Sequence, residues 1–457
     1  MTILAIIGHL VLNFLLGWSL LSLKPKERNW GEHLVSALAL GIYTETIFVA
    51  TMMFLGLGLK TAIMITASVL TGLTFLTWKR GHLRFPSLVI EKPKWYEWLL
   101  LLTVGEKIAF IGWQIFRMDL HFDDATNHWA GRAHSLFGGI NWSFDPDSPL
   151  FLGSHIAFKN YPLGTIMWST ITAVMNGEWN DVIARIEGLV FFCLIVATVW
   201  SAVWRFSQSR WFAAFAAFTV SALPLHVWHA ASGYSDTAVT TFGVLALAVL
   251  LRKEWFLAGI MVAGAAWSKN DGLALFAPSI FVGVGLWQFS WQDIIKIRWF
   301  EKQKWQNIGC CFLGIATLAP WYLYKQWHSL SLSEHMDFTW HPDAPNLFWD
   351  YVMMGPTNSI LWICLFPVMV VASFVLHQRE AGRAVFGVFW TTFAVIIYVF
   401  FFTSAYEWLK IQTTVHRTML QFSGIAVIAS SYGIWSLLNM KEFTQNKKTL
   451  PPRTQST

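Results

Sequence analysis

Long apolar segments recur along almost the whole chain of 457 residues, and they limit the possible folds more than any other feature. Each has roughly 14–25 residues and few charges, and about 20 apolar residues in a helix match the ~30 Å hydrocarbon core of a bilayer. Hydrophobic residues make up 55% of the chain and charged residues 13%, unlike an ordinary soluble domain. The sequence therefore predicts an all-α polytopic membrane protein with about 13 transmembrane helices. The predicted spans are 2–23, 34–58, 61–78, 97–116, 187–204, 211–229, 236–251, 255–268, 272–288, 305–325, 359–376, 384–403 and 414–437.

The basic residues indicate how these spans are oriented. With the N-terminus outside, 22 of the 32 Lys and Arg fall in the cytoplasmic connections and the polar tail 441–457, as the positive-inside rule favours. This placement accounts for the net charge of +6, and we expect no nucleic-acid partner. It puts the large loop 117–186 outside, and it requires that the segment 161–176 does not cross. We therefore expect a helix there that lies along the outer surface and follows Tyr161-Pro162.

Two predicted spans contain ionisable residues well inside them, Glu45 in one and Glu106-Lys107 in the other. Glu45 and Lys107 fall at similar depth in two helices that run the same way, and an unpaired charge at mid-bilayer costs at least ~2.5–3.5 kcal/mol. One hypothesis is that they pair with each other. The alternatives are a structural ion pair elsewhere or snorkelling toward the interface.

The outer loop concentrates the acidic residues of the chain. Asp123-Asp124 begin a predicted helix with the sequence DDATNHWAGRAHSLF. Capping of the helix N-terminus would account for one carboxylate, but not for two adjacent acids directly after a span. Two neighbouring acids permit a division of labour, in which one is a general base and the other orients the substrate or binds a metal.

Further charged residues recur where spans meet the outside. Asp236 opens one predicted helix, where an N-cap role is the alternative to a site role. Arg185, Lys269 and Arg417 also lie at outer helix ends. They could snorkel to headgroup phosphates, or they could converge on the phosphate of a phospholipid-like substrate at the outer leaflet.

The order of these motifs resembles that of the GT-C glycosyltransferases, which include the protein mannosyltransferases and the bacterial aminoarabinose transferases. The resemblance covers roughly residues 97–280, with a weaker echo in HRTML near Arg417. The chain departs from the family in its Asp-Asp pair, in a turn with one proline, and in three spans that precede the family's usual first helix. The motifs that carry the resemblance are FDDATNHWAGRA, KNYPLG, IARIEG, GYSDTAVTTFGVLALAVLL and LAGIMVAGAAWSKNDGLAL.

The resemblance implies a domain organisation. It consists of a three-span N-terminal extension (1–94), a GT-C-like catalytic core (95–300) that includes the outer loop with its surface helices, and C-terminal helices (301–440) with the outer loop 326–358. That second loop is rich in Trp, His and Asp, and it would form either a lid over the sugar or an interfacial aromatic belt.

The resemblance also implies an activity. Such enzymes move a sugar from a polyprenyl-phosphate carrier to a glycan, lipid or protein acceptor at the outer membrane face, here in a bacterial inner or plasma membrane. No nucleotide is implied, in keeping with the lack of a Gly-rich phosphate loop between a strand and a helix. The implied residues are Asp123 and Asp124 for catalysis, Arg185, Lys269 and Arg417 for the donor phosphate, Asp236, Tyr161 and His155 for orienting the acceptor, and Asp124 with Asp236 for a Mg²⁺ or Mn²⁺ ion.

Two other classes of function compete with this interpretation. A transporter or flippase of lipid-linked glycans should show internal repeats and polar residues at mid-membrane, but the charged residues here cluster at the outer edge. A non-catalytic subunit for glycan assembly would keep the fold and predicts that Asp123 is dispensable.

Overall fold

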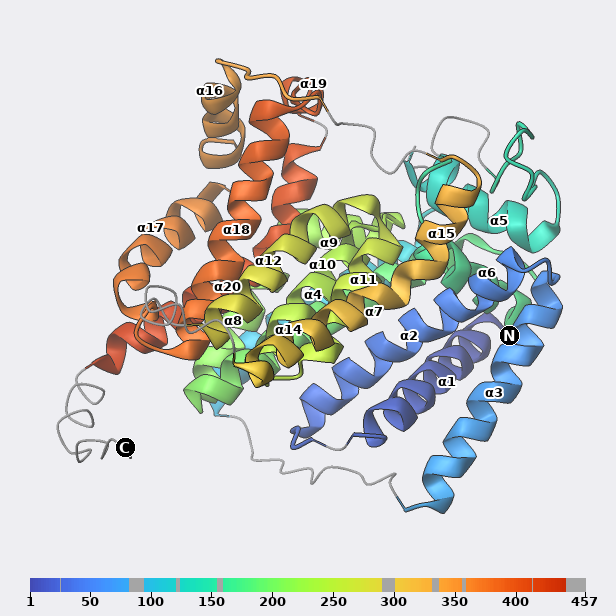
Figure 1. The fold of residues 1–457 in the computed structure, drawn as a ribbon, viewed down its shortest axis with the longest axis horizontal. Coiled ribbons are helices and arrows are strands. Elements are labelled where there is room, and N and C mark those ends of the chain that lie inside the picture. The colour runs from blue at the N-terminus through green and yellow to red at the C-terminus, as the bar shows by residue number, and fades with distance from the viewer. Residues whose placement is uncertain are drawn as a thin grey trace.

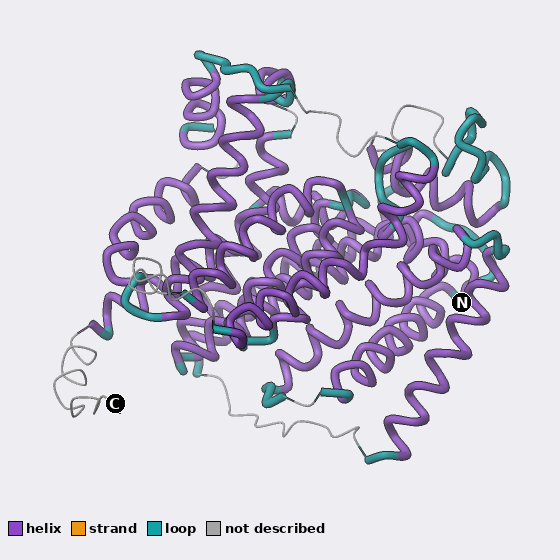
Figure 2. The backbone as a smooth tube through the Cα atoms, in the orientation of Figure 1, coloured by secondary structure: helices purple, strands orange, loops and turns teal. Residues whose placement is uncertain are grey.

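The computed structural model describes residues 1–24, 26–81, 94–120, 124–153, 159–289, 301–330, 337–355, 359–412 and 414–440. Within these ranges the regular structure is helical apart from one isolated bridge between Ser143 and Phe151 (Figure 2). The predicted all-α architecture is confirmed. Asp123, His155 and the tail 441–457, all part of the sequence predictions, lie outside the described residues.

The helices pack side by side, with α1, α2 and α3 on one side of the molecule and α17, α18 and α20 on the other (Figure 1). Three short segments of other helix types, η1, η2 and η3, interrupt the α-helices. The helices are α1 (Thr2–Ser22), α2 (Trp30–Phe54), α3 (Leu59–Lys79), α4 (Trp95–Arg117), η1 (Ala125–Trp129), α5 (Ala130–Gly138), α6 (Gly164–Asn176), α7 (Asp181–Ser207), α8 (Arg210–Ser221), α9 (Pro224–Ser232), α10 (Asp236–Leu251), α11 (Trp255–Ser268), α12 (Asn270–Gln288), α14 (Lys302–Ile315), η2 (Ala316–Leu318), α15 (Ala319–Trp327), α16 (Ala344–Phe348), η3 (Trp349–Met353), α17 (Ser359–Leu376), α18 (Glu380–Phe402), α19 (Tyr406–Lys410) and α20 (Val415–Leu438).

Membrane spans are abundant in this fold. In the part of the chain that the structure describes, ten helices are long and apolar enough to cross a bilayer. The pair α8–α9, bent by 62°, would make an eleventh span, and α10 and α11 are shorter apolar helices of 16 and 14 residues. Each predicted span coincides with one helix or with two or three consecutive helices, as α8–α9 and α14–η2–α15 do. The chain is therefore a multi-pass membrane protein by length and composition, and the number of 13 crossings stays a prediction.

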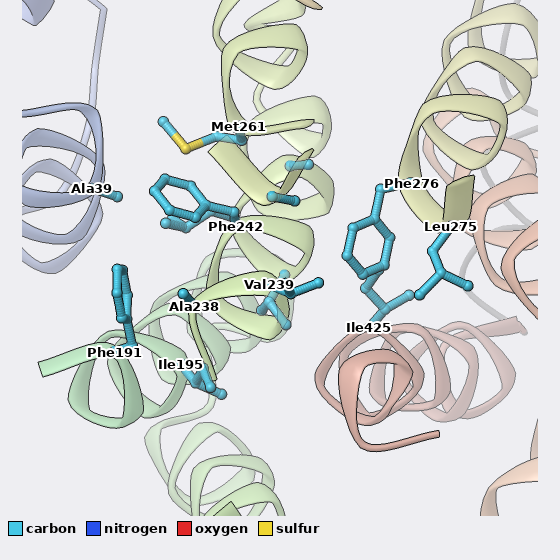
Figure 3. Packing of buried hydrophobic residues seen from close by; sticks show 14 of the residues in the cluster. Ala39, Phe191, Ile195, Ala238, Val239, Phe242, Met261, Leu275, Phe276 and Ile425 are labelled. Carbon is cyan, nitrogen blue, oxygen red and sulfur yellow. The ribbon is translucent and has the colours of Figure 1, made fainter. Parts of the chain in front are cut away.

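The core is centred on the two shorter helices, α10 and α11. Phe242 of α10 lies between Ala39 of α2 and Met261 of α11, and its ring lies 5.8 Å from that of Phe191 of α7 (Figure 3). Because α7, α11, α12 and α20 surround α10, the side chains of α10 are buried along its whole length. Four charged residues at the ends of these two helices are buried as well, namely Asp236, Arg252, Glu254 and Lys269.

The N-terminal helices are joined to this core by a buried polar network. His9 Nε2 lies 2.6 Å from Glu45 Oε2, and Asn13 Nδ2 donates to the same oxygen at 2.5 Å. Asn13 Oδ1 in turn accepts from the Trp168 indole of α6 at 3.0 Å. The hypothesis that Glu45 pairs with Lys107 is therefore wrong, because Lys107 pairs with its chain neighbour and Glu45 faces α1 instead.

The helix expected after Tyr161-Pro162 is present as α6, and other helices of the protein cover it. Almost all of its residues are buried, and its neighbours include α1, α2, α5 and α7. With 13 residues it spans only about 20 Å, too short to cross a bilayer. Gly164 allows α6 to pack closely on the backbone of Trp267. That the helix does not cross the bilayer and lies along the outer membrane surface stays a prediction.

Close helix packing makes α1 and α2 sensitive to small substitutions. A methyl group at Gly41 would overlap the carbonyl oxygen of Asn13, and one at Gly17 would overlap that of Ala37. We expect Gly41→Ala to destabilise the purified protein by about 1–3 kcal/mol, as overpacked sites do. The control is Gly72→Ala in α3, where a methyl group meets nothing within 4 Å. Thermal unfolding in detergent measures the difference, and equal melting temperatures for the two variants would contradict the packing described.

Candidate functional site

Several helix ends meet at one end of the bundle. Asp236 is the first residue of α10, Lys269 lies between α11 and α12, and Arg417 is in the first turn of α20. A helix N-terminus carries a partial positive charge that stabilises a nearby carboxylate. The structure brings these three residues into contact.

Asp236 is the centre of this cluster and is fully buried. Its Oδ1 accepts from Lys269 Nζ at 3.2 Å and from Gln421 Nε2 at 2.6 Å. Its Oδ2 accepts from Arg417 Nη2 at 2.8 Å and Nε at 3.1 Å, and His229 Nδ1 lies 3.4 Å away. Two cations thus share one buried carboxylate, and each also pairs with a second acid. The N-cap alternative is wrong for Asp236, since its oxygens are taken by these side chains.

Asp124 extends the cluster into the outer loop. Arg417 Nη1 donates to Asp124 Oδ2 at 2.5 Å, so one guanidinium bridges Asp124 and Asp236. The Arg417 and Asp124 side chains are 19% and 32% exposed, whereas that of Asp236 is inaccessible. The guanidinium also lies 4.8 Å from the centre of the Tyr234 ring, a cation–π contact. The Arg417–Asp124 pair is therefore the accessible edge of a buried charge cluster.

The helix predicted to start at the acidic pair is present, with a local irregularity. Residues Ala125–Trp129 form a π-helical turn before α5 continues with ordinary α-helical hydrogen bonds. Such π segments are rare and are often found at functional sites. Asp124 directly precedes the turn and pairs with Arg417 rather than capping the helix with its side chain.

Tyr161 lies next to the cluster, in a turn that receives hydrogen bonds from two side chains. The carbonyl of Asn160 accepts from Asn270 Nδ2 at 3.2 Å and from the buried Lys325 Nζ at 3.2 Å. The Tyr161 ring packs edge-on against Trp129, with centroids 5.7 Å apart. The turn is thereby attached to Asn270, the residue that follows Lys269.

Arg185 does not join the other two cations. It is buried in the first turns of α7, and its Nη2 donates to the carbonyls of Ile115, at 2.5 Å, and Met118 at the end of α4. Carbonyl groups at a helix C-terminus attract cations. Arg185 therefore fixes the point where α4 passes into the acidic loop, and of the three predicted phosphate ligands only Lys269 and Arg417 share a partner.

The donor set does not fit the metal ion predicted at Asp124 and Asp236. Hard cations such as Mg²⁺ need several oxygen ligands with accessible lone pairs, but both oxygens of Asp236 accept from cationic or amide groups, and Arg417 stands between the two acids. In the described ranges no group of three or more His, Cys, Asp and Glu residues could hold a metal.

Sequence reasoning missed several members of the cluster. Gln421 lies four residues after Arg417, so both face the same side of α20, and this spacing could have identified it. Asp271 pairs with Lys269 at 2.7 Å. Tyr234 and His229 belong to α9 and the turn after it, whose 62° bend relative to α8 brings them near Asp236, and the sequence gives no comparable signal for that bend.

The described part of the second outer loop packs on α18 and α19. Thr339 and His341 donate backbone hydrogen bonds to Phe402 and Phe401, and the His341 ring stacks on Tyr406 at 4.0 Å. A hydrogen bond from the Tyr406 hydroxyl to Asp343 lowers the pKa of that carboxyl and raises the pKa of Tyr406 to about 12. These contacts fix the loop at the ends of the C-terminal helices.

Comparison with protein-family models found no matching family, and comparison with curated protein sequences found no significant match. The resemblance to the GT-C glycosyltransferases thus rests on the order of the motifs alone.

The cluster predicts a large effect of neutralising Asp236. In Asp236→Asn, the buried Lys269 and the partly buried Arg417 lose their shared counter-charge, and breaking a buried ion pair costs about 3–5 kcal/mol. Asp271→Asn is the matched control, because Asp271 is 30% exposed and Lys269 keeps Asp236. Thermal unfolding should show a much larger loss for the first variant. Similar losses in both variants would mean that Asp236 is not the centre of the cluster.

Proposed function

We propose that this protein is a membrane glycosyltransferase of the GT-C type, which moves a sugar from a polyprenyl-phosphate carrier to an acceptor hydroxyl at the outer membrane face. The observation that supports this most is that the guanidinium of Arg417 pairs with both Asp124 of the outer loop and the buried Asp236. Asp236 in turn accepts a hydrogen bond from Lys269. We propose with it the 13-span topology, the outward orientation and the location in a bacterial inner or plasma membrane.

The proposed reaction needs a base and a stabilised leaving group. The acceptor hydroxyl loses its proton to a carboxylate as its oxygen bonds to the anomeric carbon, while the bond from that carbon to the carrier phosphate breaks. Asp124 already accepts from Arg417, and a carboxylate paired with a cation is a weak proton acceptor. We therefore assign the base role to Asp123, and positioning of Arg417 to Asp124.

The leaving phosphate gains negative charge, and preorganised cations nearby stabilise such charge in the transition state. Arg417 is the best placed, since its side chain is 19% exposed and one of its nitrogens contacts only the loop acid. Lys269 is buried behind Asp236 and adds its positive charge to that of Arg417 in the region where the phosphate would leave. Tyr161 borders the same opening through its contact with Trp129, and it remains a candidate for orienting the acceptor.

We predict that Asp123→Asn abolishes detectable transfer, since loss of a general base typically costs ~10²–10⁴-fold in rate. Asp124→Asn should reduce transfer less. Cells lacking the protein are restored with wild type or a variant, and mass spectrometry follows polyprenyl-phosphate sugars and envelope glycans. Asp147→Asn is the control, because Asp147 is an exposed acid of the same loop. The expected result is loss of one sugar from an envelope glycan, with accumulation of its lipid carrier.

Two outcomes would reject the enzyme. Wild-type glycans in the Asp123→Asn cells would favour a non-catalytic assembly subunit. Periodate that cannot cross the membrane can be added to spheroplasts of cells in which the carrier-linked sugar accumulates. Accumulated sugar that resists this oxidation lies on the inner leaflet, and that result would favour a transporter. A transferase defect leaves the carrier sugar on the outer leaflet, where periodate oxidises it.

A further inference from the structure

Two small cavities adjoin beneath the charge cluster. The lining of the first includes Trp129, from the π-helical turn after Asp124, and Tyr234, whose ring contacts Arg417. The second extends inward to Tyr43 and Thr46 of α2. Thr165, Glu187 and Phe191 line both cavities. The two spaces therefore meet at Glu187.

Glu187 is a buried acid with an incomplete set of partners. It is the seventh residue of α7, about 9 Å along the helix from its start, and is only 6% exposed. Ser169 Oγ donates to its Oε2 at 3.3 Å. Oε1 has no hydrogen-bond partner among the described residues, and the same holds for the hydroxyl of Thr165 beside it. No cation of the described chain contacts the carboxyl group.

A carboxylate in this position would be an unpaired buried charge, which costs several kcal/mol in a membrane protein interior. A carboxylic acid that keeps its proton avoids this cost and can both donate and accept hydrogen bonds. Buried polar atoms are almost always hydrogen-bonded, to protein or to ordered water. Each cavity is about the size of one water molecule and offers polar partners for it.

We propose that Glu187 and the two cavities form an internal proton-binding and water-binding site. Glu187 holds a proton at neutral pH, and ordered water binds its Oε1 and the Thr165 hydroxyl. Tyr43 and Tyr234 are the other titratable groups in the lining. Water in the first cavity contacts Trp129 and Tyr234, and the Tyr234 ring in turn contacts Arg417. The protonated Glu187 therefore lies close to the Arg417–Asp124 pair. The site does not depend on the glycosyl-transfer proposal.

Infrared spectroscopy of the purified full-length protein at neutral pH tests this directly. The difference spectrum of wild type minus Glu187→Gln should contain the C=O band of a protonated carboxylic acid, and in D₂O that band should move to lower frequency because water reaches the group. The control is Glu178→Gln, an exposed acid just before α7, whose difference spectrum should contain carboxylate bands only.

A second variant tests the water itself and does not need Glu187→Gln to fold. Thr165→Val keeps the shape of the side chain but removes the hydroxyl that holds the water. The acid band of Glu187 in this variant should therefore lie at higher frequency than in wild type, because Glu187 loses its hydrogen bond to that water. Carboxylate bands in place of the acid band would overturn the proposal. A band that does not respond to D₂O would mean a dry cavity, and a band abolished by added Na⁺ would mean a metal-cation site; either result would also overturn it.

Discussion

A charge removed from water must find an opposite charge or a set of hydrogen bonds, and this requirement governs the centre of the molecule. The helices α10 and α11 are enclosed by neighbours, and charged residues at both of their ends are buried. At one end, Asp236 and Lys269 pair with each other. At the other end, Arg252 donates to Glu254 at 2.7 Å, and Glu254 also accepts from Arg28. The two central helices are thus held by ion pairs at both ends.

The two ion clusters differ in what they leave accessible. One cluster is inaccessible, because the side chains of Arg252, Glu254 and Arg28 are no more than 5% exposed. Its role is to connect helices. The cluster around Asp236 is closed at its base but open at the Arg417–Asp124 pair. A buried carboxylate orients the guanidinium, and a partly exposed acid of the loop shares it. A site built in this way can exchange the loop acid for another anion without leaving the buried charges unpaired.

Hydrophobic run length and charge placement were sufficient to predict the helices and the end at which they bring charged residues together. Asp236, Lys269 and Arg417 could be predicted because each is a charge next to a long apolar run. Arg185 was grouped with them on the same grounds, but a helix end also offers carbonyls, and sequence does not distinguish those partners. Glu187 was overlooked since it fell at the start of a predicted span, where an acid is normally solvated. The burial of α6 depends on Gly164 and on the network of His9, Glu45 and Trp168, which are long-range contacts that periodicity does not encode.

The central claim is that the outer loop and the bundle are coupled through Arg417 and Asp124. A double-mutant cycle with Asp124→Asn and Arg417→Gln tests it most directly, with stability measured by chemical unfolding of the purified protein. Asp236 is present in all four proteins, so the cycle isolates the pair of interest. The account predicts that the two losses are not additive, with a coupling energy of about 0.5–3 kcal/mol, as residues in one ion-pair network show. Losses that add to within about 0.5 kcal/mol would show that the two side chains act independently and would contradict the account.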